Sequence, residues 1–154
     1  MRSHDRETVT PRPRRVRCSY CQSTHIVLPT ALQARRADTT EVIGDALPHK
    51  TNRLGYRRIA ARIHRSESTV RRWLRRATPK HLRWMYHRGA QRLIQVAPDT
   101  FGELRFLGHQ LRDTLSVLCA AAYWDRHRLS LLDPPSTIIG TYTLGRLLAP
   151  PPPG

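Results

Sequence analysis

The stretch YRRIAARIHRSESTVRRWLRR, residues 56–76, decides the fold because it contains two short amphipathic helical patterns with almost nothing between them. The apolar residues recur at helical spacing on one face of each half: Tyr56, Ile59, Ala60 and Ile63, then Val70, Trp73 and Leu74. His64 and Arg65 leave room only for a tight turn, and Ser66 is a residue type that caps a second helix. This pattern is typical of a helix-turn-helix, in which a small residue such as Ala60 lets two helices cross closely.

The polar face of the second helix, which we expect over 66–76, combines a small hydroxyl with arginines. With a step of about 100° per residue, the side opposite the apolar residues is formed by Ser68, Arg71, Arg72 and Arg75. Because arginine can donate two hydrogen bonds to a guanine edge, we expect this face to read the major groove of duplex DNA. The remaining predicted DNA contacts, most of them to phosphates, are Arg57, Arg58, Arg62, Ser66, Thr69 and Arg76.

The charge balance favours a polyanionic partner. The 154 residues contain 27 Lys and Arg against 11 Asp and Glu, a formal net charge of +16. Residues 1–80 carry 19 cations and 6 acids, and residues 53–76 carry nine cations against one acid, Glu67. A plain helical pair with a solvated arginine face is the alternative, but one acid cannot supply surface ion pairs for nine cations. Charge and spacing together therefore favour double-stranded DNA as the partner.

The pair Cys18 and Cys21 has C-x2-C spacing, which supplies two of the four ligands that tetrahedral zinc requires. No second cysteine pair follows, so three interpretations stay open. The pair is a decayed or truncated zinc site, a zinc site completed by His25, His4 or a second chain, or a turn without metal. Cys119 lies in an apolar helical pattern far along the chain and is expected to be a small core residue.

Outside this region the chain is predicted to be mainly α-helical. Asp38-Thr39-Thr40-Glu41 has capping-box spacing and opens a helix with Val42, Ile43, Ala46 and Leu47 inward, which Pro48 is expected to stop. Helices over 79–97 and 100–128, the second opened by Thr100-Phe101-Gly102-Glu103, are expected to pack as a hairpin. The predicted organisation is a disordered basic arm at 1–15, a partial zinc-ribbon-like knuckle and strand at 16–30, a helix-turn-helix domain at 38–77, a helical hairpin at 79–130 and a Pro-rich tail at 131–154.

Several segments resemble a known type of protein: Arg17-Cys18, Cys21 and 24–29, then Glu41-Val42-Ile43-Gly44, then 56–63 and 68–76. They are similar to an uncharacterised actinobacterial family whose members look like the N-terminal region of insertion-sequence transposases, a zinc ribbon followed by a homeodomain-like helix-turn-helix. The resemblance implies DNA binding, with Cys18 and Cys21 as half of a zinc site. The chain departs from that pattern in the absence of a cysteine pair before residue 14, in Pro48, and in His64 where the turn often has glycine.

We therefore expect a transposase-related DNA-binding protein, cytoplasmic and associated with the nucleoid. A dimeric transcriptional regulator, a degenerate transposon remnant without specific binding, and RNA binding through the basic arm are the alternatives. Zinc is the one cofactor considered, and a homodimer through the 100–128 helix is an alternative to the hairpin. No small-molecule substrate is expected.

Neither catalysis nor a membrane span is expected. No run of about 18 apolar residues is present. A nuclease needs acids on a strand pattern to hold two metal ions, and the acids of the second half do not follow one. These acids are Asp99, Glu103, Asp113, Asp125 and Asp133. No catalytic residues are therefore predicted. The histidines of that half are expected to be solvated on helix surfaces: His81, His87, His109 and His127.

Overall fold

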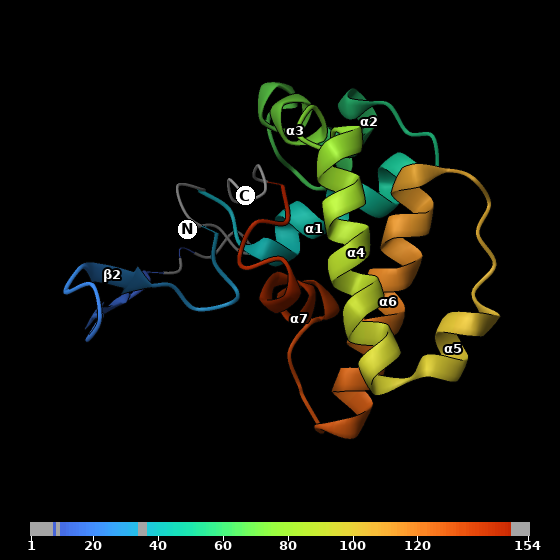
Figure 1. Cartoon of the computed structure of the whole chain (residues 1–154). Coiled ribbons are helices and arrows are strands. Elements are labelled where there is room, and N and C mark those ends of the chain that lie inside the picture. The colour runs from blue at the N-terminus through green and yellow to red at the C-terminus, as the bar shows by residue number, and fades with distance from the viewer. Residues whose placement is uncertain (1–7, 9, 34–36, 149–154) are drawn as a thin grey trace.

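The computed structural model describes residues 8, 10–33 and 37–148. These residues form a mainly helical protein with one small two-stranded sheet, as Figure 1 shows, which confirms the predicted fold class at that level. In chain order the elements are β1 Arg14–Arg17, β2 Thr24–Val27, α1 Thr40–Thr51, α2 Tyr56–Arg62, α3 Glu67–Leu74, α4 Pro79–Val96, α5 Pro98–Glu103, α6 Gln110–Arg128 and α7 Pro135–Tyr142. Of the predicted disordered arm, 1–7 and 9 lie outside the described residues, whereas Arg14 and Arg15 belong to β1.

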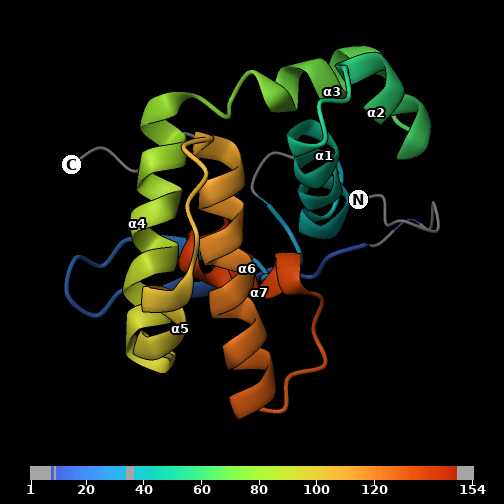
Figure 2. The same ribbon diagram turned by 90° about the vertical axis from the view of Figure 1, so that its right-hand side faces the viewer.

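Helices α4 and α6 form the centre of the helical body and run parallel to each other (Figures 1 and 2). At the start of both helices, Gln110 Nε2 donates a hydrogen bond to the Pro79 carbonyl at 3.0 Å. Near the end of both helices, Arg92 Nη2 lies 2.6 Å from Asp125 Oδ1 in an ion pair. A hairpin would place the start of one helix beside the end of the other, so the predicted helical hairpin at 79–130 is wrong.

The parallel arrangement arises because the predicted continuous helix over 100–128 does not exist. Between α4 and α6 only α5 is helical and it ends at Glu103, and the following residues carry the chain back along the body to Gly108, which has a φ of +71°. Helix α6 then begins at Gln110, where His109 Nδ1 accepts a hydrogen bond from the Arg112 amide at 3.3 Å. Leu107, in this non-helical segment, is therefore 64% exposed.

Gly89 allows α4 and α6 to approach closely. A Cβ atom at this position would lie 2.9 Å from Leu118 Cδ2 and 3.2 Å from Val117 Cγ1, and both of these side chains are fully buried. Glycine lowers helix stability by up to about 1 kcal/mol relative to alanine. The close packing of the two central helices offsets that cost.

Helix α1 is longer than the sequence predicts, because Pro48 does not stop it. In the last turn a proline removes one amide donor, and the Pro48 carbonyl still accepts hydrogen bonds from the Thr51 hydroxyl at 2.7 Å and the Asn52 amide at 3.1 Å. The N-cap residue is Thr39 rather than the predicted Asp38. The predicted inward residues are all buried: Val42, Ile43, Ala46 and Leu47.

The segment predicted as a Pro-rich tail contributes to the core. Helix α7 begins at Pro135, since proline is favoured in the first turn of a helix, and it packs against α6 and α1. The chain then buries Leu147, whose carbonyl lies 3.0 Å from His81 Nε2. His81 is 2% exposed rather than solvated, and burial lowers its pKa. Residues 149–154 of the predicted tail lie outside the described residues.

Replacing Gly89 with alanine tests the close approach of α4 and α6. We expect the free energy of unfolding to fall by about 1–3 kcal/mol, the usual cost of overpacking, less the gain in helix propensity. Urea denaturation followed by circular dichroism measures it. Gly102→Ala is the matched control, because no atom lies within 4 Å of its added Cβ. Equal stability of the two variants would contradict the packing described here.

Candidate nucleic-acid interface

Helices α2 and α3 lie together at one end of the helical body (Figure 2). Their apolar faces are buried as predicted. They consist of Ile59, Ala60 and Ile63 before the turn and of Val70 and Trp73 after it. Tyr56 and Leu74 are half-buried at the edges of this contact. The sequence therefore predicted correctly which face of each helix points inward.

The turn between α2 and α3 ends the first helix with a left-handed residue. His64 has a φ of +51°, and its amide bonds to the Ala61 carbonyl at 3.4 Å. The Arg65 amide bonds to the Ala60 carbonyl at 3.0 Å. These two hydrogen bonds form a Schellman motif, which usually places glycine where this chain has histidine. The departure from the turn pattern is thus accommodated by the backbone of His64.

The side chains opposite the buried face reach solvent. Eight of the ten predicted DNA-binding residues are exposed: Arg57, Arg58, Arg62, Ser66, Ser68, Arg71, Arg72 and Arg75. Thr69 and Arg76 are half-buried. Helix α3 is shorter than the predicted 66–76 helix, because it ends at Leu74 and the last two arginines lie in the turn that follows.

One cation of this region is not available to a ligand. Arg65 is buried in the turn, and its Nε atom lies 2.6 Å from Asp38 Oδ1; both side chains are 3% exposed. The guanidinium also donates to the carbonyls of Ile63 and His64. Asp38 is therefore a buried ion-pair partner instead of a helix cap. The pair joins the chain before α1 to the turn between α2 and α3.

Three contacts of the exposed arginines were not predicted from the sequence. The guanidinium of Arg71 lies 5.8 Å from the centre of the Tyr56 ring, and that of Arg57 lies 5.9 Å from the same ring. Arg57 Nε also lies 3.5 Å from Glu67 Oε2, between two largely exposed side chains. The spacing of Tyr56 to Arg71 across a tight turn is the only sequence signal for the first contact. Exposed pairs of this kind contribute little to stability, but they orient both arginines.

The two cysteines of the C-x2-C pair lie in the turn between β1 and β2. The strands are antiparallel, with Arg17 opposite Thr24 and Arg14 opposite Val27. The turn closes with hydrogen bonds from the Cys18 amide to the Ser23 carbonyl at 2.9 Å and from the Gln22 amide to the Cys18 carbonyl at 3.0 Å. Hydrogen bonding to Ser23, and then to His25 and Cys18, lowers the pKa of Cys21 to about 6.

This turn carries two free cysteines, Cys18 and Cys21. Two neighbouring thiols on a tight turn suit tetrahedral zinc, which needs two further ligands. Among residues 8, 10–33 and 37–148, no group of three or more His, Cys, Asp or Glu side chains is placed to hold a metal ion. His4, one of the predicted substitutes, lies outside these residues.

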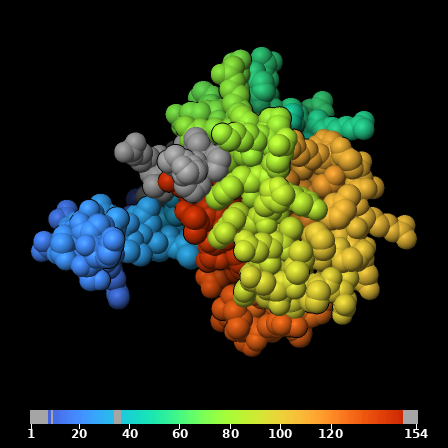
Figure 3. Space-filling view, viewed as in Figure 1, coloured from blue at the N-terminus to red at the C-terminus, as the bar shows by residue number. Residues whose placement is uncertain are grey.

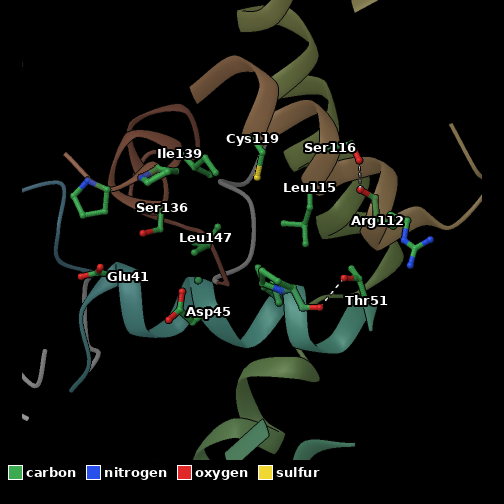
Figure 4. A pocket seen from close by; sticks show the side chains of 15 residues that line it. Glu41, Asp45, Thr51, Arg112, Leu115, Ser116, Cys119, Ser136, Ile139 and Leu147 are labelled. Carbon is green, nitrogen blue, oxygen red and sulfur yellow. Dashed lines mark hydrogen bonds between the residues drawn. The ribbon is translucent and has the colours of Figure 1, made fainter. Parts of the chain in front are cut away.

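Cys119 is not the core residue that its apolar neighbours suggested. It is exposed and lines a cavity of about 450 Å³ between α1, α6 and α7. Figure 4 shows its sulfur pointing into the cavity near Leu115, Ile139 and Leu147. Cys119 lies on the side of α6 that faces this cavity rather than on the side that packs against α4.

Two acids of the second half, Asp113 and Asp125, are engaged in structural contacts. Asp125 is buried, pairs with Arg92 and accepts a hydrogen bond from the Tyr142 hydroxyl. Asp113 Oδ1 accepts from the Leu107 amide at 3.0 Å. No helix in the described part of the chain is both long and apolar enough to cross a membrane.

Comparisons with models of protein families, with curated proteins and with solved structures find no match for this chain. The arrangement of α2 and α3 therefore has to be interpreted from its own residues.

Replacing Asp38 with alanine tests whether the ion pair holds the α2–α3 turn. The variant leaves Arg65 buried without its carboxylate, so we expect the free energy of unfolding to fall by about 3–5 kcal/mol. Chemical denaturation measures this difference. Asp99→Ala, at an exposed carboxylate, should change stability by no more than about 0.5 kcal/mol. If both variants cost the same, the pair does not hold the turn.

Proposed function

We propose that the protein binds double-stranded DNA through a helix-turn-helix formed by α2 and α3, with α3 in the major groove. The burial of one face and the exposure of the other supports this most directly. Val70 and Trp73 hold α3 against the body, so Ser68, Arg71 and Arg72 point away from it. A helix with a short hydroxyl and planar donors on its free face suits the recognition of base edges.

The charges around α3 support the same ligand. Residues 53–76 contain nine cations and a single acid. Arg65 forms a buried ion pair with Asp38, and the single acid, Glu67, lies beside Arg57. The other cations have no carboxylate of their own segment to pair with, so phosphates are their natural counterions. The resemblance to the N-terminal region of transposases points to duplex DNA as well.

The role of α2 follows from its position beside α3. Arg58 and Arg62 are exposed on the helix that precedes the recognition helix. In helix-turn-helix proteins the first helix crosses the DNA backbone while the second enters the groove. We therefore assign Arg58 and Arg62 to phosphate contacts, and Ser68, Arg71, Arg72 and Arg75 to the groove.

Replacing Arg72 with alanine tests the groove contact. Selection from a random duplex library on the full chain first supplies a preferred duplex, and affinities for it and for scrambled duplexes are then measured by fluorescence anisotropy. We expect Arg72→Ala to reduce the free-energy difference between the two duplexes by about 1–3 kcal/mol, the worth of a bidentate guanine contact.

Arg128→Ala is the matched control for this experiment. Arg128 is exposed at the end of α6, which lies beside the end of α4 that is remote from α3. This variant should keep full discrimination. Unchanged discrimination in Arg72→Ala would remove Arg72 from the groove, and the absence of any enriched duplex would contradict sequence-specific binding.

Replacing Arg58 with alanine tests the phosphate contacts separately. Its loss should weaken preferred and scrambled duplexes by the same factor, because phosphates carry no sequence information. The slope of log affinity against log salt concentration should become shallower by about 0.9, since one counterion fewer is released. A loss confined to the preferred duplex would instead make Arg58 a base-reading residue.

A further inference from the structure

The β1–β2 hairpin stands away from the helical body, as the space-filling view in Figure 3 shows. Every residue of both strands is exposed, so the hairpin packs against no other element of the described chain. The apolar side chains of Val16 and Val27 share one face of the hairpin and are 46% and 49% exposed. A two-stranded hairpin without such packing is only marginally stable in water. A ligand that holds the two strands together at their turn would therefore stabilise the hairpin.

The end of the hairpin carries the chemistry for such a partner. Cys18 and Cys21 are both uncommitted to a disulfide and sit on the turn farthest from the strand ends that join the body. Tyr20 between them is 96% exposed, so the tip is open to another molecule. Two thiols from one turn and two from another complete the four-sulfur tetrahedron that structural zinc prefers.

Electrostatics favours a site of this composition. Residues 8–37 contain no Asp or Glu, while Arg12, Arg14, Arg15 and Arg17 lie on or before β1. Two such hairpins repel each other unless negative charge lies between them. A zinc ion with four thiolates has a net negative charge, and it would sit between the two arginine-rich strands. Arg17 already lies against the turn, where its Nε donates to the Gln22 carbonyl at 3.2 Å.

We propose that one zinc ion bridges two copies of this chain, held by Cys18 and Cys21 of each copy at the tips of their hairpins. The site joins the molecules through their most protruding parts, so both copies keep the free face of α3 uncovered. This inference does not rest on DNA binding, because its tests measure metal uptake and mass.

Cobalt(II), which reports zinc sites by absorption, tests the bridge directly. Full-length, metal-free protein kept reduced with a phosphine is titrated with Co²⁺, and its mass is followed by analytical ultracentrifugation. We expect thiolate-to-cobalt charge transfer and tetrahedral ligand-field bands that saturate at one cobalt per two chains. The mass should rise from that of one chain to that of two at the same point, and Zn²⁺ should replace the cobalt.

Cysteine variants distinguish this site from others. Cys18→Ser and Cys21→Ser should abolish both cobalt uptake and dimer formation, while Cys119→Ser, at the remaining cysteine, should abolish neither. Circular dichroism checks that the helical body of each variant is folded, because the helical signal does not come from the hairpin. Saturation at one cobalt per chain in a monomer would overturn the proposal and show a site completed within the chain, as by His25 or His4. Absence of uptake, or uptake that survives Cys18→Ser, would also overturn it.

Discussion

The burial of Trp73 and Val70 is the constraint on which the arrangement of α3 depends. Trp73 is the largest fully buried side chain, and α3 has only eight residues. Only one orientation of this short helix buries the Trp73 side chain. That orientation turns the opposite face, with Arg71 and Arg72, toward solvent. The direction of the arginines is therefore a consequence of apolar packing rather than of charge. The proposed DNA contact uses a face that the core leaves free.

A second constraint positions the turn that carries α3. The buried pair of Asp38 and Arg65 joins the chain before α1 to the turn after α2. An ion pair that is 3% exposed on both sides is strongly destabilised when one partner is lost, because the other charge stays buried. Helix α1 in turn packs against α6 and α7. The interface proposed for DNA is thus mounted on the helical body through α1, and α3 also leads directly into α4.

Local patterns in the sequence predicted the inward faces of α1, α2 and α3, because helical periodicity alone decides them. They did not predict contacts between distant residues. Asp38 has the spacing of a cap, yet a buried Arg65 competes for the same carboxylate. Thr100 to Glu103 has the spacing of a capping box, yet Gly102 and Gly108 flank a return segment that makes α4 and α6 parallel. Cys119, expected in the core, is exposed, and His81, expected at the surface, is buried. Both environments depend on where α7 and the chain after it pack.

The most direct measurement for the DNA interface is a nitrogen-15 NMR spectrum of backbone amides and arginine Nε–H groups, recorded with and without duplex DNA. If α3 enters the groove, the largest changes fall on α2, on α3 and on the side chains of Arg71 and Arg72. The signals of the last turn of α6, including Arg128, should stay unchanged. Changes confined to the hairpin arginines, or spread evenly over all exposed arginines, would contradict the assignment of α3 as the DNA-reading helix.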